Sequence, residues 1–147
     1  MIAYVVDASV AAKWYLPADD EPHKQEALAL LGDYTAGLIE IVFPDVFWVE
    51  FENILWKAAR RGRISRQTAE ESVAELANFE IPSVGCKTLL KEALTIANTF
   101  DRTVYDASYV ALAAALGVVL VTADERLANA LAARFPIRWL GAYVGSQ

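Results

Sequence analysis

Residues 104–116 read VYDASYVALAAAL, and this stretch indicates the fold. Thr103 before it is a candidate helix cap and Gly117 after it is a candidate stop, so the pattern predicts a helix over Val104–Leu116. The helix is apolar on nearly every side, which is typical of a buried helix. Asp106 is its only charged residue. Because a buried carboxylate is costly unless something neutralises it, we expect a positive partner for Asp106.

Two short apolar runs elsewhere in the chain predict buried strands. They are Ile2–Val6 (IAYVV) and Val118–Thr122 (VVLVT). Both are continuously apolar, as are strands of a parallel sheet that is covered on both faces. Strands that alternate with helical segments predict a three-layer α/β/α sandwich around a central parallel sheet.

Capping residues, prolines and glycines give the expected bounds of the other elements. The expected strands are Leu38–Phe43, Glu80–Val84 and Ile137–Leu140. The expected helices are Val10–Leu16, 20–34, Asp45–Arg61, 65–78, Thr88–Phe100 and 124–135. Ser9 and Ser65 are the expected caps of the first and fourth of these helices, and Pro44 is expected in the first turn of Asp45–Arg61. A capping box from Thr122 to Glu125 is expected to open the last helix.

The composition limits the class of protein. A chain of 147 residues, 56% hydrophobic, is expected to form one domain over 1–147. No apolar run reaches the length of a membrane span, and the first residues lack the basic region of a secretory signal, so we expect a cytoplasmic protein without a membrane partner. One cysteine and one histidine exclude an internal disulfide and a multi-histidine metal site. The net charge of −6 argues against general coating of nucleic acid, but not against a nuclease whose bound ions supply positive charge.

Four acidic residues are expected to meet at one edge of the sheet. Asp7 ends the first strand and Asp124 follows the VVLVT strand, so both lie at the carboxyl edge, where open parallel sheets bind ligands. Asp106 begins its helix, and Glu50 lies on the long helix. Four converging carboxylates repel one another, and Mg²⁺ or Mn²⁺ relieves this with oxygen ligands alone. Two such ions could clamp the oxygens of a phosphodiester displacement.

Each of these residues also has an ordinary structural interpretation. Asp7 could be a turn residue, and Ser9 could be only a helix cap. Asp106 could complete a capping box with the residue before its helix. Glu50 could belong to a solvated polar stripe, and Asp124 could be a first-turn acid favoured by the helix dipole. The set is more informative than any member because of its strand and helix context.

Four segments together resemble a PIN domain of the VapC toxin type. They are VVDASV, PDVFWVEFENILWKAARRGRIS, TVYDASYVALAAALG and LVTADERL, and they cover nearly the whole chain. The resemblance implies a parallel sheet of about five strands. It also implies an Mg²⁺- or Mn²⁺-dependent endoribonuclease that hydrolyses RNA with metal-activated water, as the toxin of a type II toxin–antitoxin pair. Its implied partners are a second copy in a homodimer and an antitoxin whose tail enters the acidic groove.

The resemblance also carries roles over to single residues. Asp7, Glu50, Asp106 and Asp124 match the catalytic, metal-binding acids of the family. Ser9, Asn53 and Thr122 match its supporting polar positions. No acid of the set is missing.

The long helix has two further features. A group of cations lies at the end of this helix and just after it: Lys57, Arg60, Arg61, Arg63 and Arg66. These side chains can bind RNA phosphates, or they can be the ordinary basic residues of a helix C-terminus. The helix also carries more apolar surface than one core stripe needs, which indicates a partner unless the core takes it all; the residues are Phe47, Trp48, Phe51, Ile54, Leu55 and Trp56.

Two other functions stay open on the sequence. The same acids could serve a DNA nuclease or a phosphohydrolase. Alternatively, the fold could be a non-catalytic module that binds a partner through its aromatic helix.

Overall fold

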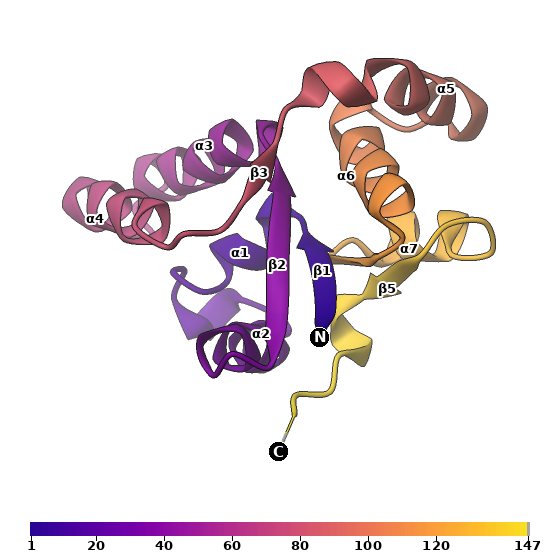
Figure 1. Ribbon diagram of the computed structural model, residues 1–147. Coiled ribbons are helices and arrows are strands. Elements are labelled where there is room, and N and C mark those ends of the chain that lie inside the picture. The colour runs from indigo at the N-terminus through magenta and orange to yellow at the C-terminus, as the bar shows by residue number, and fades with distance from the viewer. Residues whose placement is uncertain (147) are drawn as a thin grey trace.

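The centre of the computed structural model, which describes residues 1–146, is a five-stranded parallel sheet (Figure 1). Gln147, the last residue of the expected domain, lies outside the described residues. The strand order is β3-β2-β1-β4-β5. The strands are β1 (Ile2–Val6), β2 (Ile39–Pro44), β3 (Ser83–Val84), β4 (Val119–Thr122) and β5 (Ile137–Trp139).

Helices cover both faces of this sheet and complete the three-layer α/β/α sandwich expected from the sequence (Figure 1). One face carries α1 to α4, and the other carries α5 and α6 (Figure 1). The α-helices are α1 (Ala8–Ala12), α2 (Lys24–Thr35), α3 (Val46–Arg60), α4 (Arg66–Ala77), α5 (Leu90–Phe100), α6 (Val104–Leu116) and α7 (Glu125–Leu131). Short 3-10 turns are η1 (Ala18–Asp20), η2 (Cys86–Leu89) and η3 (Leu140–Ala142).

The central strand β1 explains the continuous apolar runs. Val5 pairs with Val42 on β2 and with Leu120 on β4, and both Val5 and Leu120 are fully buried. A strand that has helices over both faces has no solvent-facing side, so apolar and polar residues do not alternate along it. The order of the sheet reverses direction at β1 and β4, which makes the carboxyl ends of these strands the topological switch point.

At both helices that begin beside this switch point, the predicted capping residue was wrong. Asp7, not Ser9, caps α1, because the Asp7 carboxylate accepts the Val10 N–H at 3.2 Å. Asp124, not Thr122, caps α7 by accepting the Leu127 N–H at 3.1 Å. In each case an aspartate that the sequence assigned to function also satisfies an unpaired amide of a helix end.

Several expected bounds were also wrong. Pro44 belongs to β2 and not to α3, since β1 pairs with β2 only as far as Val42 and needs no amide from Pro44. The predicted helix 20–34 is a 3-10 turn followed by α2, with His23 in a left-handed conformation between them. The other differences are that α1 and α7 end earlier than expected, β3 has two residues, and a 3-10 turn precedes α5.

The predicted bounds of α6 are confirmed, with Thr103 as its cap and Gly117 in the left-handed region at its end. The expectation that α6 is buried all round was wrong. Its middle is buried, but Tyr105 in the first turn and Leu116 in the last are exposed. Among the described helices, none is long and apolar enough to cross a bilayer.

Candidate active site

Asp7 is a buried carboxylate at the end of β1, with 8% of its surface exposed. The Ser9 hydroxyl and the Val10 amide both donate to its Oδ1. The pKa of Asp7 is raised to about 6, mainly by burial and to a smaller extent by the nearby charge of Asp106, although the hydroxyls of Ser9 and Thr122 and the Val10 amide lower it. The fold therefore keeps an acid where ionisation is unfavourable without a cation.

Asp124 lies at the same edge of the sheet as Asp7 because β1 and β4 are neighbours. The pairing of Val6 with Val121 places the residues after these strands at one edge. Thr122 is fully buried there, and its Oγ1 accepts the Asp124 N–H at 3.1 Å. Thr122 thus contributes to both acidic positions, which fits its predicted supporting role.

Asp106 is the electrostatic centre of the group. It raises the pKa of Asp7 and of Glu50, and its own pKa is raised by burial first and then by the charge of Asp124. Arg102 lowers the pKa of Asp106, which makes Arg102 a cation within electrostatic reach. Asp106 is therefore within electrostatic reach of the other three predicted acids, which lie just after β1, on α3 and at the start of α7.

Glu50 is held by a residue that the sequence argument missed. Tyr109 Oη donates to Glu50 Oε1 at 2.6 Å, and the Tyr109 side chain is almost completely buried. Burial raises the pKa of Glu50, and this hydrogen bond lowers it. Tyr109 follows Asp106 by three residues on α6, so helical spacing could have placed it on the side of the helix that carries the acid.

The predicted supporting residues differ in their surroundings. Ser9 bonds directly to Asp7. Asn53 is exposed on α3, one turn after Glu50, and Tyr109 is the donor to the Glu50 side chain in the described part of the chain. Asn53 is consequently free to meet a ligand rather than engaged in fixing Glu50.

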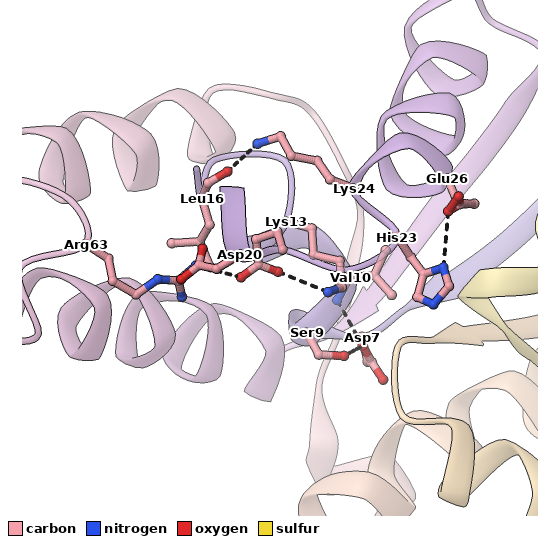
Figure 2. Close-up of polar contacts among 11 residues, drawn as sticks. Asp7, Ser9, Val10, Lys13, Leu16, Asp20, His23, Lys24, Glu26 and Arg63 are labelled. Carbon is pink, nitrogen blue, oxygen red and sulfur yellow. Dashed lines mark hydrogen bonds and ion pairs between the residues drawn. The ribbon is translucent and has the colours of Figure 1, made fainter. Parts of the chain in front are cut away.

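The predicted basic cluster divides into two groups. Arg63 donates to Asp20 at 2.6 Å and to Glu21 at 3.0 Å, and Glu21 also pairs with Lys13 at 3.0 Å. Figure 2 shows Arg63 directed towards Asp20, and the separate hydrogen bonds from Ser9 and Val10 to Asp7. Arg63 therefore ties the end of α3 to the segment after α1. The exposed cations of the cluster are Lys57, Arg60, Arg61 and Arg66.

The donor atoms available to a metal are carboxylate and hydroxyl oxygens, which suit Mg²⁺ or Mn²⁺. Within residues 1–146, no group of three or more Asp, Glu, His or Cys side chains is arranged to hold an ion as it stands. Mg²⁺ commonly binds one or two carboxylates and completes its shell with waters and substrate phosphates. The acids around Asp106 fit that kind of site better than a closed cage of four protein ligands.

A family model for the PIN domain matches residues 4–131. The chain belongs to the PIN domain family. This PIN domain is 35% identical over 127 residues to Ribonuclease VapC3 of Pyrobaculum aerophilum, covering 85% of this chain and 92% of that protein. It is 33% identical over 129 residues to Exonuclease VapC9 of the same organism, covering 86% and 84%.

Solved structures share the fold. The VapC20 toxin of Mycobacterium tuberculosis, described as cleaving the sarcin–ricin loop, superposes on this PIN domain with a TM-score of 0.65 at 17% identity, over 90% of this chain and 95% of that one. VapBC2 of Rickettsia felis, bound to promoter DNA, gives a TM-score of 0.62 at 12% identity, over 94% and 98%. The chain is thus a PIN domain of the VapC type, as the sequence motifs indicated.

Proposed function

We propose that this PIN domain hydrolyses phosphodiester bonds of RNA at the acids around Asp106, with Mg²⁺ or Mn²⁺. One observation carries the proposal: Asp106 lies within electrostatic reach of Asp7, Glu50 and Asp124 at the switch point of the sheet. The names of the VapC3 and VapC20 relatives support RNA as the substrate class.

Each residue has a role that follows from its surroundings. Asp7 and Asp106 would hold the ion, with Asp124 joining directly or through a water. When bound, a divalent ion would neutralise the acids and supply Lewis-acid chemistry at the scissile phosphate. Glu50, oriented by Tyr109, would accept a hydrogen bond from the attacking water. Asn53 would contact a substrate phosphate or base.

The deciding experiment is incubation of total RNA with purified protein in Mn²⁺, in Mg²⁺ and in EDTA. Discrete products that require metal and disappear with Asp106→Asn support the proposal. Asp19→Asn is the matched control, since Asp19 is an exposed acid in η1, outside the acid group. No metal-dependent product from folded protein contradicts the proposal and favours a binding module. Cleavage of DNA in preference to RNA favours a DNA nuclease, and cleavage of small phosphoesters favours a phosphohydrolase.

The mode of cleavage needs its own test, because one relative is named an exonuclease. We propose endonucleolytic cleavage. A circular RNA should be opened by the protein if this is correct, whereas an exonuclease leaves the circle intact.

We also propose an antitoxin partner that binds beside α3, in a cytoplasmic setting, and a homodimeric toxin. A groove of about 580 Å³ between α3 and α4 is lined mainly by Leu55, Trp56, Ala59, Ala69 and Val73, with Glu52, Arg60, Arg66 and Glu70 around it. An apolar groove with a charged rim suits an amphipathic helix. The VapBC2 complex among the structural neighbours supports such a partner. Sedimentation of the protein, alone and with the product of an adjacent small reading frame, tests both assemblies.

A further inference from the structure

A second hollow, of about 560 Å³, lies between α3 and the first turn of α6, against the acid group. It is lined by Val46, Val49, Glu50, Glu52, Asn53, Trp56 and Tyr105. Glu50 belongs to both the acid group and this hollow, and Tyr105 is the chain neighbour of Asp106. The hollow therefore borders the acid group, and a ligand larger than a phosphate that binds at the acids can reach it.

Two aromatic rings at this hollow are open to solvent. Trp56 is 53% exposed and Tyr105 is 55% exposed, although neither is needed to pack the core. The Trp56 side chain lines both the α3–α4 groove and the hollow beside the acids. The Arg60 guanidinium stacks over its ring at 5.0 Å, and Arg60 lines the α3–α4 groove but not the hollow beside the acids. The ring thus has a cation on one side and open space on the other.

The carboxylates that line the hollow disfavour a phosphate there and allow a neutral base. Glu50 and Glu52 repel a phosphate there, so a phosphate is held at the acids only with a metal ion. A neutral base is not repelled, and carboxylate and amide groups such as Glu52 and Asn53 pair with the amino and ring N–H groups of bases. Aromatic faces stack on bases of single-stranded RNA whatever the sequence.

We propose that this hollow is a nucleobase subsite: it binds the base next to the scissile phosphate of single-stranded RNA, stacked on Tyr105 and Trp56. The inference rests on the proposed function and adds to it that the substrate must be unpaired at this position. Glu52 and Asn53 contact the polar edge of the base, and Arg60 holds its side of the Trp56 ring.

A protein segment is the competing occupant, and the molecule offers it a better place. The α3–α4 groove combines a row of small and branched apolar side chains with both signs of charge. The hollow beside the acids has no cation among its lining residues, and all its ionisable side chains apart from Tyr105 are carboxylates. A base that arrives with its phosphate on the acids fits this hollow better than a helix does.

The test uses full-length Glu50→Gln protein, which lacks the carboxylate proposed to orient the attacking water but keeps Asp7 and Asp106 for the ion. The ligand is a labelled single-stranded RNA of about 12 nucleotides with millimolar Mn²⁺. Tyr105→Ala and Trp56→Ala are each expected to weaken binding by about fivefold or more. Tyr105→Phe and Trp56→Phe keep an aromatic face and should bind as the parent does. Leu94→Ala on α5 is the control, because Leu94 is equally exposed, at 54%, on another helix.

Two further measurements separate stacking from structure. An RNA with abasic sites should bind the parent and the alanine variants alike. Trp56 is the most exposed of the four tryptophans, so RNA should quench its emission, and Trp56→Phe should remove that quenching. Equal binding by all variants, or a loss that persists with abasic RNA, overturns the subsite. Altered self-association with RNA binding intact assigns the hollow to a protein and also overturns it. Failure of wild-type protein to cut any RNA is a separate result that contradicts the proposed function.

Discussion

Tyr109 on α6 donates a 2.6 Å hydrogen bond to Glu50 on α3, joining residues that are 59 positions apart in the chain. Tyr109 is 3% exposed, and burial together with Glu50 raises its pKa above the usual value, so its hydroxyl stays protonated and donates at neutral pH. The two helices flank the acid group, and this bond fixes the Glu50 carboxylate between them.

Tyr109→Phe should lower cleavage by about 10- to 100-fold, the usual effect of losing a group that orients a metal-site residue. The ring stays buried, so the protein should remain folded. Tyr143→Phe is the matched control, because its hydroxyl is also buried on a carboxylate, Asp33 at 2.5 Å, away from the site. Cleavage rates and thermal melts of both variants check this. Equal loss of activity in the two would show that Tyr109 matters only for stability.

The stability of the metal-free protein should fall as pH rises from about 4 to 6. The pKa of Asp7 is about 6 in the fold and 3.8 without it. The native state therefore holds a proton that the unfolded chain releases in this window, and ionising Asp7 destabilises the fold by up to about 3 kcal/mol. Asp7→Asn should then be more stable than wild type at pH 7 and equal to it near pH 4, as denaturant melts at both pH values will show.

Asp33→Asn is the control for this pH dependence. Hydrogen bonds from Tyr143 and the Ser146 amide lower the pKa of Asp33, so its charge stabilises the fold above the pKa of the unfolded chain. This substitution should destabilise the protein at pH 7, the opposite sign to Asp7→Asn. The same sign for both would contradict the raised pKa of Asp7 in the folded protein.

Millimolar Mn²⁺ should raise the melting temperature of wild-type protein, since an ion that binds only the native state at about 100 times its Kd adds about 2.7 kcal/mol. Asp106→Asn should lose most of this shift, because Asp106 interacts with all the other acids. Asp19→Asn should retain it. A wild-type melt unaffected by Mn²⁺ would argue against a metal site.

Some basic residues at the end of α3 should contribute to RNA binding, and Arg63 should contribute to stability. Lys57→Ala and Arg61→Ala should weaken RNA binding, and each should reduce the salt dependence by about one charge if the side chain contacts a phosphate. Arg63→Ala should chiefly lower the melting temperature, because Arg63 pairs with Asp20 and Glu21. Binding measured at several salt concentrations, beside melts, checks the division. Normal stability in Arg63→Ala, with a reduced salt slope, would contradict it.

Most of the fold was predictable because its signals are local. The apolar strands, the Thr103 cap and the Gly117 stop give β1, β4 and α6 from neighbouring residues alone. Caps at the site were harder. Asp7 and Asp124 each cap a helix and also face the acid group, and one-dimensional rules assign such positions to Ser9 and Thr122, which are good caps in isolation.

The sequence by itself determined the α/β class and the family, and it singled out the four acids as candidates, since periodicity and motif spacing are properties of the chain. Only the tertiary structure decided that Tyr109 holds Glu50, that Arg63 is tied to Asp20 and Glu21, and that Trp56 and Tyr105 border one hollow. These relationships join residues far apart in the chain. Their geometry is fixed by how α3 and α6 pack on opposite faces of the sheet, which no local pattern encodes.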